Sequence, residues 1–217
     1  MIDAAIEAGV KRFIPSDWAS ISTDPDVRSL SFYQLWVQVQ DYLTKKAEEG
    51  KIEYTIFQVG AFLEYIINYP LVIDFGNKST ELYDDGNHKF SATSVAGVGK
   101  AVVGALSNPE ASKNRTLFTH EIVLSQAQIV DLVKKHDAKA AEWSITKLDS
   151  QKELVESQQA LDENPTGYEQ AVRVLKATVF GGKYRAAFAK VDNGLVGLSL
   201  LPEGQFEEMV VSKLAEA

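Results

Sequence analysis

The sequence predicts an α/β protein in which helices pack on a parallel sheet, followed by a smaller α/β lobe. In the first third of its 217 residues, amphipathic helical stripes alternate with short apolar runs that suit buried strands. Further along, strand-like runs precede helices that begin with capping motifs. Because 45% of the residues are hydrophobic, the chain is long and apolar enough to bury a core.

The first predicted elements are a short helix and a buried strand. Ile2 and Ile6 lie at helical spacing, and Gly9 is placed to end that helix. The run from residue 10 to residue 15 (VKRFIP) then predicts a strand. A helix, a glycine and a strand in this order form half of a βαβ crossover.

A second helix and strand follow in the same order. An apolar stripe from Phe32 to Ala47 predicts a helix that stops at Gly50. The run EYTIFQVGAF predicts a buried strand that ends at Gly60. These four elements favour a parallel sheet with helices packed on it.

The remainder of the chain predicts a smaller lobe and C-terminal helices. A turn is expected at Asp85-Gly86, and a helix through AGVGKAVVGAL. Strand-like runs occur at RTLFTHEIVL and EWSITKL, and the last helices lie in YEQAVRVLKATVF and near FEEMVVSKL. Two of the later helices are expected to begin at capping boxes: Ser125 with Gln128, and Ser150 with Glu153.

Charge and composition exclude several classes of partner and site. The net charge of −8 argues against nucleic acid and anionic membranes as partners, because both need a basic face. The chain has no cysteine, which rules out disulfides and thiolate metal sites and suits a cytoplasmic protein. Its three histidines are scattered, without the spacing of a metal site. No window approaches the roughly 20 apolar residues of a membrane span.

The candidate site begins at the end of the first predicted strand, where the apolar run gives way to Pro15-Ser16-Asp17-Trp18. Side chains at the carboxyl ends of parallel strands can meet a ligand, so Ser16 and Asp17 are candidate binding residues. The alternative is that one of them caps the following turn. Trp36 lies on an apolar helix stripe, where core packing explains it more simply than a ligand contact.

The 217 residues contain no nucleotide-binding glycine motif. Gly97-x-Gly99-Lys100 has Ser94 where a phosphate loop needs glycine, and Ala101 where it needs serine or threonine. No spacing among the glycines gives G-x-G-x-x-G. Close packing of a helix is therefore the better explanation of the small residues around Gly97.

Three segments together resemble the NmrA-like and isoflavone-reductase-like family of atypical short-chain dehydrogenases. They are MIDAAIEAGVKRFIPSDW, VQVQDYLTKKAEEGKIEYT and VGAFLEY, all within residues 1–65. The family pattern has a helix and strand reading AA..AGVKRF.PSEFG, then a YL and YT helix-strand unit, then a G.F turn that touches the nicotinamide. The resemblance is specific over residues 1–65 and weaker towards the C-terminus, where the family has its substrate-binding lobe.

The resemblance implies NADP(H) as cofactor and a partial Rossmann-type sheet in an N-terminally truncated member. In the family, a glycine-rich turn that cradles the pyrophosphate comes before the segment seen here, together with the first strands. Residues 1–75 would form the C-terminal part of the NAD(P)-binding domain, and residues 76–217 the substrate-binding lobe and C-terminal helices. A small-molecule substrate is implied, and a protein partner or a homodimer would cover the sheet that the missing strands leave open.

The family pattern also implies site residues. Those expected to face the nicotinamide are Ser16, Asp17, Gly60 and Phe62. Those expected to line the substrate side are Trp18, Trp36, Tyr65 and Ile66. Seven positions before Leu43 the family carries a lysine that assists proton transfer, and this chain has Trp36 there. No catalytic residue and no metal ligand is predicted.

Three interpretations of function remain open from the sequence. The first is an NADP(H)-dependent reductase of a small aromatic or secondary metabolite, impaired by the missing strands and by Trp36. The second is a non-catalytic regulator or binding protein that acts through a protein partner, which Trp36 and the acidic composition fit. The third is a fragment that retains the family's second half.

Overall fold

The structure is a computed structural model that describes residues 1–216. The strands are β1 (Arg12–Phe13), β2 (Glu53–Gln58), β3 (Ala61–Phe62), β4 (Ile73–Asp74), β5 (Ser79–Tyr83), β6 (Lys89–Thr93), β7 (Arg115–Phe118), β8 (Ile122–Ser125) and β9 (Ser144–Leu148). The helices are α1 (Ile2–Glu7), α2 (Gln34–Glu48), α3 (Leu63–Asn68), α4 (Val95–Ser107), α5 (Pro109–Ser112), α6 (Gln126–His136), α7 (Ser150–Glu163), α8 (Tyr168–Phe180), α9 (Asn193–Val196) and α10 (Gln205–Glu216). Short 3-10 helices are η1 (Pro25–Val27), η2 (Ser31–Tyr33) and η3 (Ala140–Glu142).

A parallel sheet of order β1-β2-β7 confirms the predicted α/β class. Strand β2 is central, and its last four residues, Thr55 to Gln58, are buried because both faces of the parallel sheet are covered. Strand β7 comes from beyond residue 75 and pairs with β2 from Thr55↔Arg115 to Gln58↔Phe118, so the two predicted parts of the chain share this sheet.

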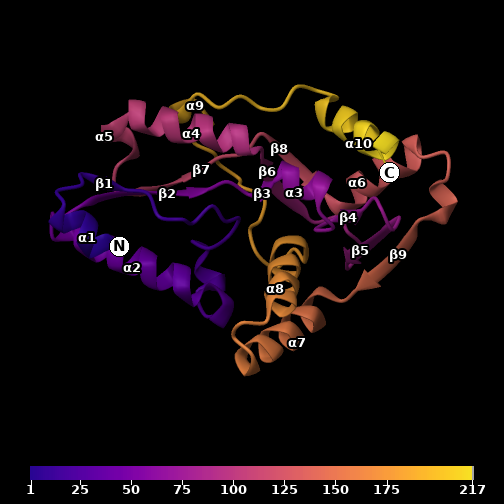
Figure 1. Cartoon of the computed structure of the whole chain (residues 1–217), viewed down its shortest axis with the longest axis horizontal. Helices are drawn as coiled ribbons and strands as arrows, with labels where there is room; N and C mark the ends of the chain where they lie inside the picture. The colour runs from indigo at the N-terminus through magenta and orange to yellow at the C-terminus, as the bar shows by residue number, and fades with distance from the viewer. Residues whose placement is uncertain (217) are drawn as a thin grey trace.

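Helices cover both faces of this sheet, with α4 above and α2 below in Figure 1. On the α4 side, Phe57 and Leu117 pack against small helix residues, and Val98, Ala101 and Ala105 form one apolar cluster with them. Ser94 is the N-cap of helix α4, and its hydroxyl accepts a hydrogen bond from the N–H of Gly97. The small residues of this helix therefore serve close packing.

Two further three-stranded sheets lie beyond the first. One has the order β3-β6-β8 and the other β4-β5-β9, and each combines a parallel and an antiparallel pair. The larger apolar core lies among these sheets and helices, and its fully buried aromatic side chains include Tyr83 and Phe90. In Figure 1, α7 and α8 project below this region and α6 and α10 lie beside it.

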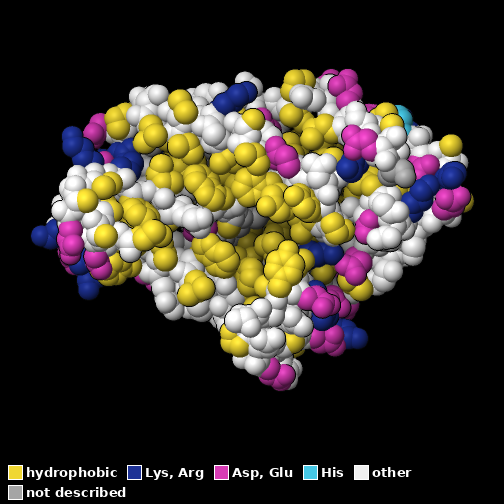
Figure 2. Space-filling view, viewed as in Figure 1, with side chains coloured by type: hydrophobic (Ala, Val, Ile, Leu, Met, Phe, Trp, Pro, Cys, Tyr) yellow, Lys and Arg dark blue, Asp and Glu magenta, His cyan; other side chains and the backbone are white. Residues whose placement is uncertain are grey.

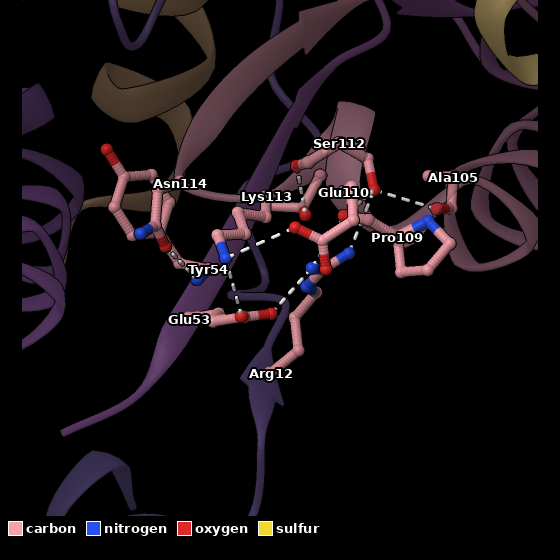
Figure 3. Close-up of polar contacts among 10 residues, drawn as sticks. Arg12, Glu53, Tyr54, Ala105, Pro109, Glu110, Ser112, Lys113 and Asn114 are labelled. Carbon is pink, nitrogen blue, oxygen red and sulfur yellow. Dashed lines mark hydrogen bonds and ion pairs between the residues drawn. The ribbon is translucent and has the colours of Figure 1, made fainter. Parts of the chain in front are cut away.

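A polar cluster joins the amino ends of the strands (Figure 3). Arg12 donates hydrogen bonds to Glu53 at 2.6 Å, to the hydroxyl of Ser112 at 2.8 Å and to the carbonyl of Pro109 at 2.7 Å. Lys113 adds a second cation beside Glu53 at 3.4 Å. The hydrogen bond from Arg12 is the main cause that lowers the pKa of Glu53. This cluster ties β1 to β2 and α5.

The two outer edges of the parallel sheet differ. Asp192 accepts a hydrogen bond from the N–H of Phe118 and donates its own N–H to the carbonyl of Phe118, which covers the β7 edge. On the opposite edge, the carbonyl of Lys11 faces β2, so alternation turns the backbone of Arg12 outward. Within residues 1–216 no strand pairs with that outward edge of β1.

Apolar side chains gather around a hollow at the centre of one face, while charged side chains lie mostly towards the ends (Figure 2). Across residues 1–216, single apolar side chains that reach the surface include Val95, Val103 and Leu106 on α4, and Val10 before β1. Over residues 1–216, no helix is both long and apolar enough to cross a membrane.

Two sequence predictions of detail were wrong. The capping box at Ser150 with Glu153 does not form, because Asp149 is the N-cap and its carboxylate accepts from the N–H groups of Gln151 and Lys152. The run RTLFTHEIVL is not one strand but two, β7 and β8, which lie in different sheets. The capping box at Ser125 with Gln128 is confirmed.

Candidate functional site

The carboxyl ends of the parallel strands form the candidate site. Ser16 to Trp18 follow β1, Gly60 to Phe62 follow β2, and Thr119 follows β7. Because β1, β2 and β7 are parallel, these three ends meet at one edge of the sheet. In open α/β sheets this is the edge where ligands bind.

Asp17 turns into the protein at this edge, where only 2% of it is exposed. Its carboxylate accepts hydrogen bonds from the Ser22 hydroxyl at 2.6 Å and from the Gln40 amide at 2.7 Å. The Gln58 amide lies at 3.5 Å from the carboxylate and donates to the Ser22 hydroxyl at 2.8 Å. We call Asp17, Ser22, Gln40 and Gln58 the buried polar cluster.

Burial dominates the electrostatics of this cluster. It raises the pKa of Asp17, because the charged carboxylate loses water, while the hydrogen bonds from Ser22, Gln40 and Gln58 act in the opposite direction. Among residues 1–216 no lysine, arginine or histidine forms an ion pair with Asp17. The carboxyl is therefore stabilised only by neutral donors.

The opposite side of the sheet edge is aromatic. The ring of Trp18 stacks on Phe57, with centroids 5.4 Å apart and planes at 28°. Trp18 and Phe62 are half-buried, and both pack against the apolar cluster under α4. The structure thus brings together two of the predicted site residues, one from each neighbouring strand end.

Gly60 and Ser16 complete this edge. Gly60 has a φ of +72°, and a Cβ there would lie 2.1 Å from the carbonyl oxygen of Ser91. No other residue fits that position without moving the backbone of β6. Ser16 is exposed, so its hydroxyl is open to a ligand.

Trp36 and Ile66 lie in a different environment from Trp18 and Phe62. Trp36 packs beside Phe32 and Tyr33, at centroid distances of 5.4 and 5.9 Å, and against the larger core. Ile66 is fully buried in that core, on the inner side of α3. Asp17 and Ile66 therefore present almost no surface, and their predicted ligand contacts stay predictions.

Tyr65 lies on the outer side of α3 and is half exposed. Its ring lies 5.8 Å from Phe62 and stacks on Tyr69 at 4.9 Å. The three rings form a row that leads from the strand end to the exposed side of α3, where Tyr65 and Tyr69 reach the surface. A flat ligand bound beside Phe62 at the carboxyl ends of the strands would therefore lie next to this row of rings.

Sequence reasoning missed three members of the buried polar cluster: Ser22, Gln40 and Gln58. Gln58 carried a usable signal, because it is a polar residue at the end of the apolar strand TIFQ. Ser22 and Gln40 carried none, since they lie in a loop and on a helix and reach Asp17 only after folding. Their donors explain how a carboxyl group can be buried there.

Some polar atoms at this edge have no hydrogen-bond partner within residues 1–216. They are the Ser20 hydroxyl, the Gln58 side-chain oxygen and the Thr119 hydroxyl, all buried; Gln58 and Thr119 lie at or just beyond strand ends, and Ser20 follows Ala19, which bridges to Gln58. These atoms leave polar groups unsatisfied inside the protein near the strand ends. The same residues contain no group of three or more metal-ligating side chains.

His120 lies next to this edge and is held by several hydrogen bonds. Its Nδ1 lies 2.9 Å from the Ser91 hydroxyl, which also accepts from the N–H of Phe188. Asn193 bonds both the N–H and the carbonyl of His120. Burial lowers the pKa of His120, so the ring is held in its neutral form.

Several known proteins are similar to this chain in sequence. The sequence model described as the NmrA-like family matches residues 1–178. Oxidoreductase aprR of Aspergillus flavus is 32% identical over 155 residues, which are 70% of this chain and 51% of that protein. Oxidoreductase poxI of Penicillium oxalicum is 28% identical over 166 residues, 73% of this chain and 51% of that protein. The chain thus spans about half the length of these relatives.

Solved structures show the same fold at low sequence identity. A ternary complex of leucoanthocyanidin reductase from Vitis vinifera aligns with a TM-score of 0.67 at 16% identity, over 99% of this chain and 72% of that one. An isoflavone reductase aligns with a TM-score of 0.65 at 18% identity, over 100% of this chain and 69% of that one. From the family match over residues 1–178, the chain belongs to the NmrA-like family.

Proposed function

We propose that this chain forms the nicotinamide- and substrate-facing part of an NADP(H)-dependent reductase that acts on a small aromatic or secondary metabolite. One observation carries the proposal. Two half-buried aromatic side chains, Trp18 and Phe62, come from neighbouring strand ends and pack on one apolar cluster at the ligand-binding edge of the sheet.

The relatives support the reaction class and the cofactor. The curated relatives are named oxidoreductases, and a leucoanthocyanidin reductase of the same fold is described as a complex with NADPH. NADP(H), when bound, supplies or accepts a hydride at the nicotinamide ring. The protein's part is to hold that ring and to exclude water from it.

Each site residue has a role in this proposal. Phe62 and Trp18 would hold the nicotinamide ring, and the exposed hydroxyl of Ser16 would be available to bond it. Gly60 lets the backbone approach closely. Tyr65 contacts an aromatic substrate by stacking, because its exposed ring continues from Phe62.

The adenosine and pyrophosphate half of the cofactor has no such site, since the 217 residues contain no glycine-rich turn. We propose that residues 1–75 belong to the C-terminal part of the NAD(P)-binding domain and that residues 76–217 contain the substrate lobe, except for β7, which belongs to the same sheet as β1 and β2, and α4, which packs on that sheet. The unpaired β1 edge would accept the segment that carries the pyrophosphate-binding turn, as part of the same protein or of a partner.

A second candidate function is that of a non-catalytic regulator or binding protein, which binds its ligand without turnover and acts through a protein partner. The specific observation that favours it is Trp36, which stands where the family pattern has its lysine and packs with Phe32 and Tyr33. An indole cannot transfer a proton at neutral pH. This candidate predicts that NADPH binds to the chain but is not oxidised by any aromatic acceptor.

Saturation-transfer NMR with NADP⁺ tests the proposal directly. Saturation of the protein is expected to reach the nicotinamide protons strongly and the adenine protons weakly, because only the nicotinamide end has a site. The Phe62→Ala variant should lose most of the nicotinamide signal. Tyr168→Ala is the matched control, since Tyr168 is 82% exposed on α8 and lies outside the site.

Two results would count against the proposal. Equal saturation of adenine and nicotinamide protons would mean that the chain binds the whole dinucleotide by another route. No saturation of either ring would mean that the strand ends do not form a nicotinamide site. NADPH oxidation assays with aromatic acceptors then separate the reductase from the non-catalytic candidate.

A further inference from the structure

Asp17 combines two properties that a ligand contact does not explain. It is buried, with 2% of its surface exposed, and it sits between two residues that do reach the surface, Ser16 and Trp18. We propose that Asp17 is a positioning residue: the hydrogen bonds that its carboxylate accepts fix residues 16–24 and thereby place Ser16 and Trp18 at the ligand-binding edge. The ligand-binding consequence rests on the proposed function, whereas the placement of Trp18 does not.

The donors to Asp17 come from three separate elements. Ser22 belongs to the loop after β1, Gln40 to α2 and Gln58 to the end of β2. One carboxylate therefore joins the loop to the helix below the sheet and to the central strand. Each donor is neutral, so the carboxylate is the only full charge in the buried polar cluster.

Asp17 and Trp18 lie on opposite sides of the sheet edge. Asp17 faces Gln40 on α2, while the ring of Trp18 stacks on Phe57, on the side of α4. The next residue, Ala19, bridges to Gln58, and its carbonyl accepts the N–H of Val59 at 3.0 Å. Holding Asp17 on one side therefore sets where the ring of Trp18 can lie on the other.

The charged and titratable groups near the cluster are few. Arg28 donates to the Gln40 side-chain oxygen at 3.4 Å and is paired with Asp41 at 2.5 Å. Tyr33 lies close enough for Asp17 to contribute to the raised pKa of its hydroxyl, which burial dominates. The raised pKa of Asp17 itself means that it gains a proton at a higher pH than an exposed aspartate.

The same loop has a second anchor of a different kind. Asp24 accepts two hydrogen bonds from the guanidinium of Arg185, both at 2.9 Å. This pair is open to water on the Arg185 side and holds the far end of the loop to the segment after α8. It allows the effect of Asp17 to be separated from general loosening of the loop.

The test uses the full chain with 5-fluorotryptophan at its three tryptophans and ¹⁹F NMR. Trp→Phe variants assign the resonances of Trp18, Trp36 and Trp143. In Asp17→Asn, the Trp18 resonance is expected to shift or broaden, because an amide at position 17 turns N–H groups against the donors of Gln40 and Ser22. Trp143, which bonds to Asp137 far from this edge, should not move.

Two variants serve as controls. Asp26→Asn changes an exposed acid of the same loop and should leave the Trp18 resonance in place. Asp17→Glu keeps a carboxylate and should restore most of the wild-type position. An unchanged Trp18 resonance in Asp17→Asn would overturn the proposal, as would an equal shift in Asp26→Asn.

A pH titration of the wild-type chain covers the case in which Asp17→Asn does not fold. The Trp18 resonance should titrate with a midpoint above about 3.9, the ordinary aspartate value, and Ser22→Ala should alter that midpoint. A Trp18 resonance that does not respond to pH before the protein unfolds would overturn the proposal.

Ligand binding gives the functional readout, with reduced nicotinamide mononucleotide as the probe. Misplacing a binding group by about 1 Å has large effects, so Asp17→Asn is expected to weaken binding by roughly tenfold to a hundredfold and Asp26→Asn not at all. If wild type and variants all fail to bind the probe, the proposed function fails. The ¹⁹F shifts then still decide whether Asp17 positions Trp18.

Discussion

The two outer edges of the parallel sheet are built in opposite ways. The β7 edge is covered by Asp192 and Asn193, which bond the backbone of Phe118 and His120 as a further strand would. The β1 edge, within residues 1–216, has no such cover, and its strand is only two residues long. Natural proteins usually blunt or cover a sheet edge, because an open one pairs with other chains.

The difference shows what holds β1 in place. Since β1 gains no hydrogen bonds on its outer side, it depends on β2 beside it and on Arg12, which anchors it to α5 (Figure 3). The β7 edge already has its hydrogen-bond partners in Asp192 and Asn193. Within residues 1–216, one outer edge of the sheet is therefore covered and the other is open.

The largest expected effect comes from removing the side chain of Phe57, which lies in the central strand between the two outer edges. Phe57 is fully buried in the central strand, under α4. Phe57→Ala should lower the free energy of unfolding by ~3–5 kcal/mol, because it leaves a cavity. Chemical denaturation gives the loss, and hydrogen exchange should show both edges opening together. An effect confined to one edge would mean that the cluster under α4 does not join them.

Arg12→Ala should open the β1 edge selectively. The guanidinium is buried and donates three hydrogen bonds, so its loss should cost about 3 kcal/mol. Amides of β1 should exchange faster while that of Phe118 stays protected. Lys113→Ala, on the exposed side of the same cluster, is the control and should change stability much less. Equal effects of the two variants would contradict the anchoring role of Arg12.

Asp192→Ala should open the β7 edge in the same way. The N–H of Phe118 then loses its partner, at a cost of ~1–3 kcal/mol, and the amide should become exchangeable. We also expect a greater tendency to associate, measured by light scattering, because a second edge is exposed. Lys190→Ala alters an exposed residue nearby and should have neither effect. A Phe118 amide that stays protected in Asp192→Ala would show that something else covers this edge.

The smallest expected effect concerns the pH dependence of stability. Asp17 and Asp24, two acids in the loop after β1, should change the free energy of unfolding in opposite directions as the pH changes. Asp24 has a lowered pKa, chiefly through its hydrogen bond with Arg185, so its stabilisation is lost as the pH falls below about 3.9. Asp17 has a raised pKa, so the folded chain binds its proton more readily than the unfolded chain does. Stability should therefore decrease as the pH rises from about 3.9 through the folded pKa of Asp17.

Denaturation curves recorded at pH values below and above about 3.9 test the separate contributions of Asp17 and Asp24 to stability. Asp17→Asn should remove the decrease above pH ~3.9 and leave the loss at lower pH, while Asp24→Asn should do the reverse. Identical pH profiles for the two variants would contradict the separate roles of the two acids.

The sequence predicted local structure well and tertiary contacts poorly. Residues 168–180 form the expected helix, and Gly9 ends α1 with a φ of +70°, because helical stripes and glycine stops are local signals. The strand expected over residues 10–15 is paired only at Arg12 and Phe13, since strand length depends on the neighbouring strands.

The candidate site was predicted in part for the same reason. The family pattern pointed to Trp18 and Phe62, which the structure places on one cluster. It gave no sign that Asp17 turns inward, because its donors Gln40 and Gln58 are 23 and 41 residues away in the sequence. Contacts of this kind arise from the fold and leave no periodic pattern.

One measurement tests the central claim most directly, namely that this chain holds the nicotinamide end of the cofactor and not the adenosine end. Thermal unfolding is recorded with NADPH and with reduced nicotinamide mononucleotide at equal concentrations, because a ligand that binds only the folded state raises the melting temperature. The account predicts upward shifts of similar size for both. A much larger shift with NADPH, or no shift with either, would contradict it.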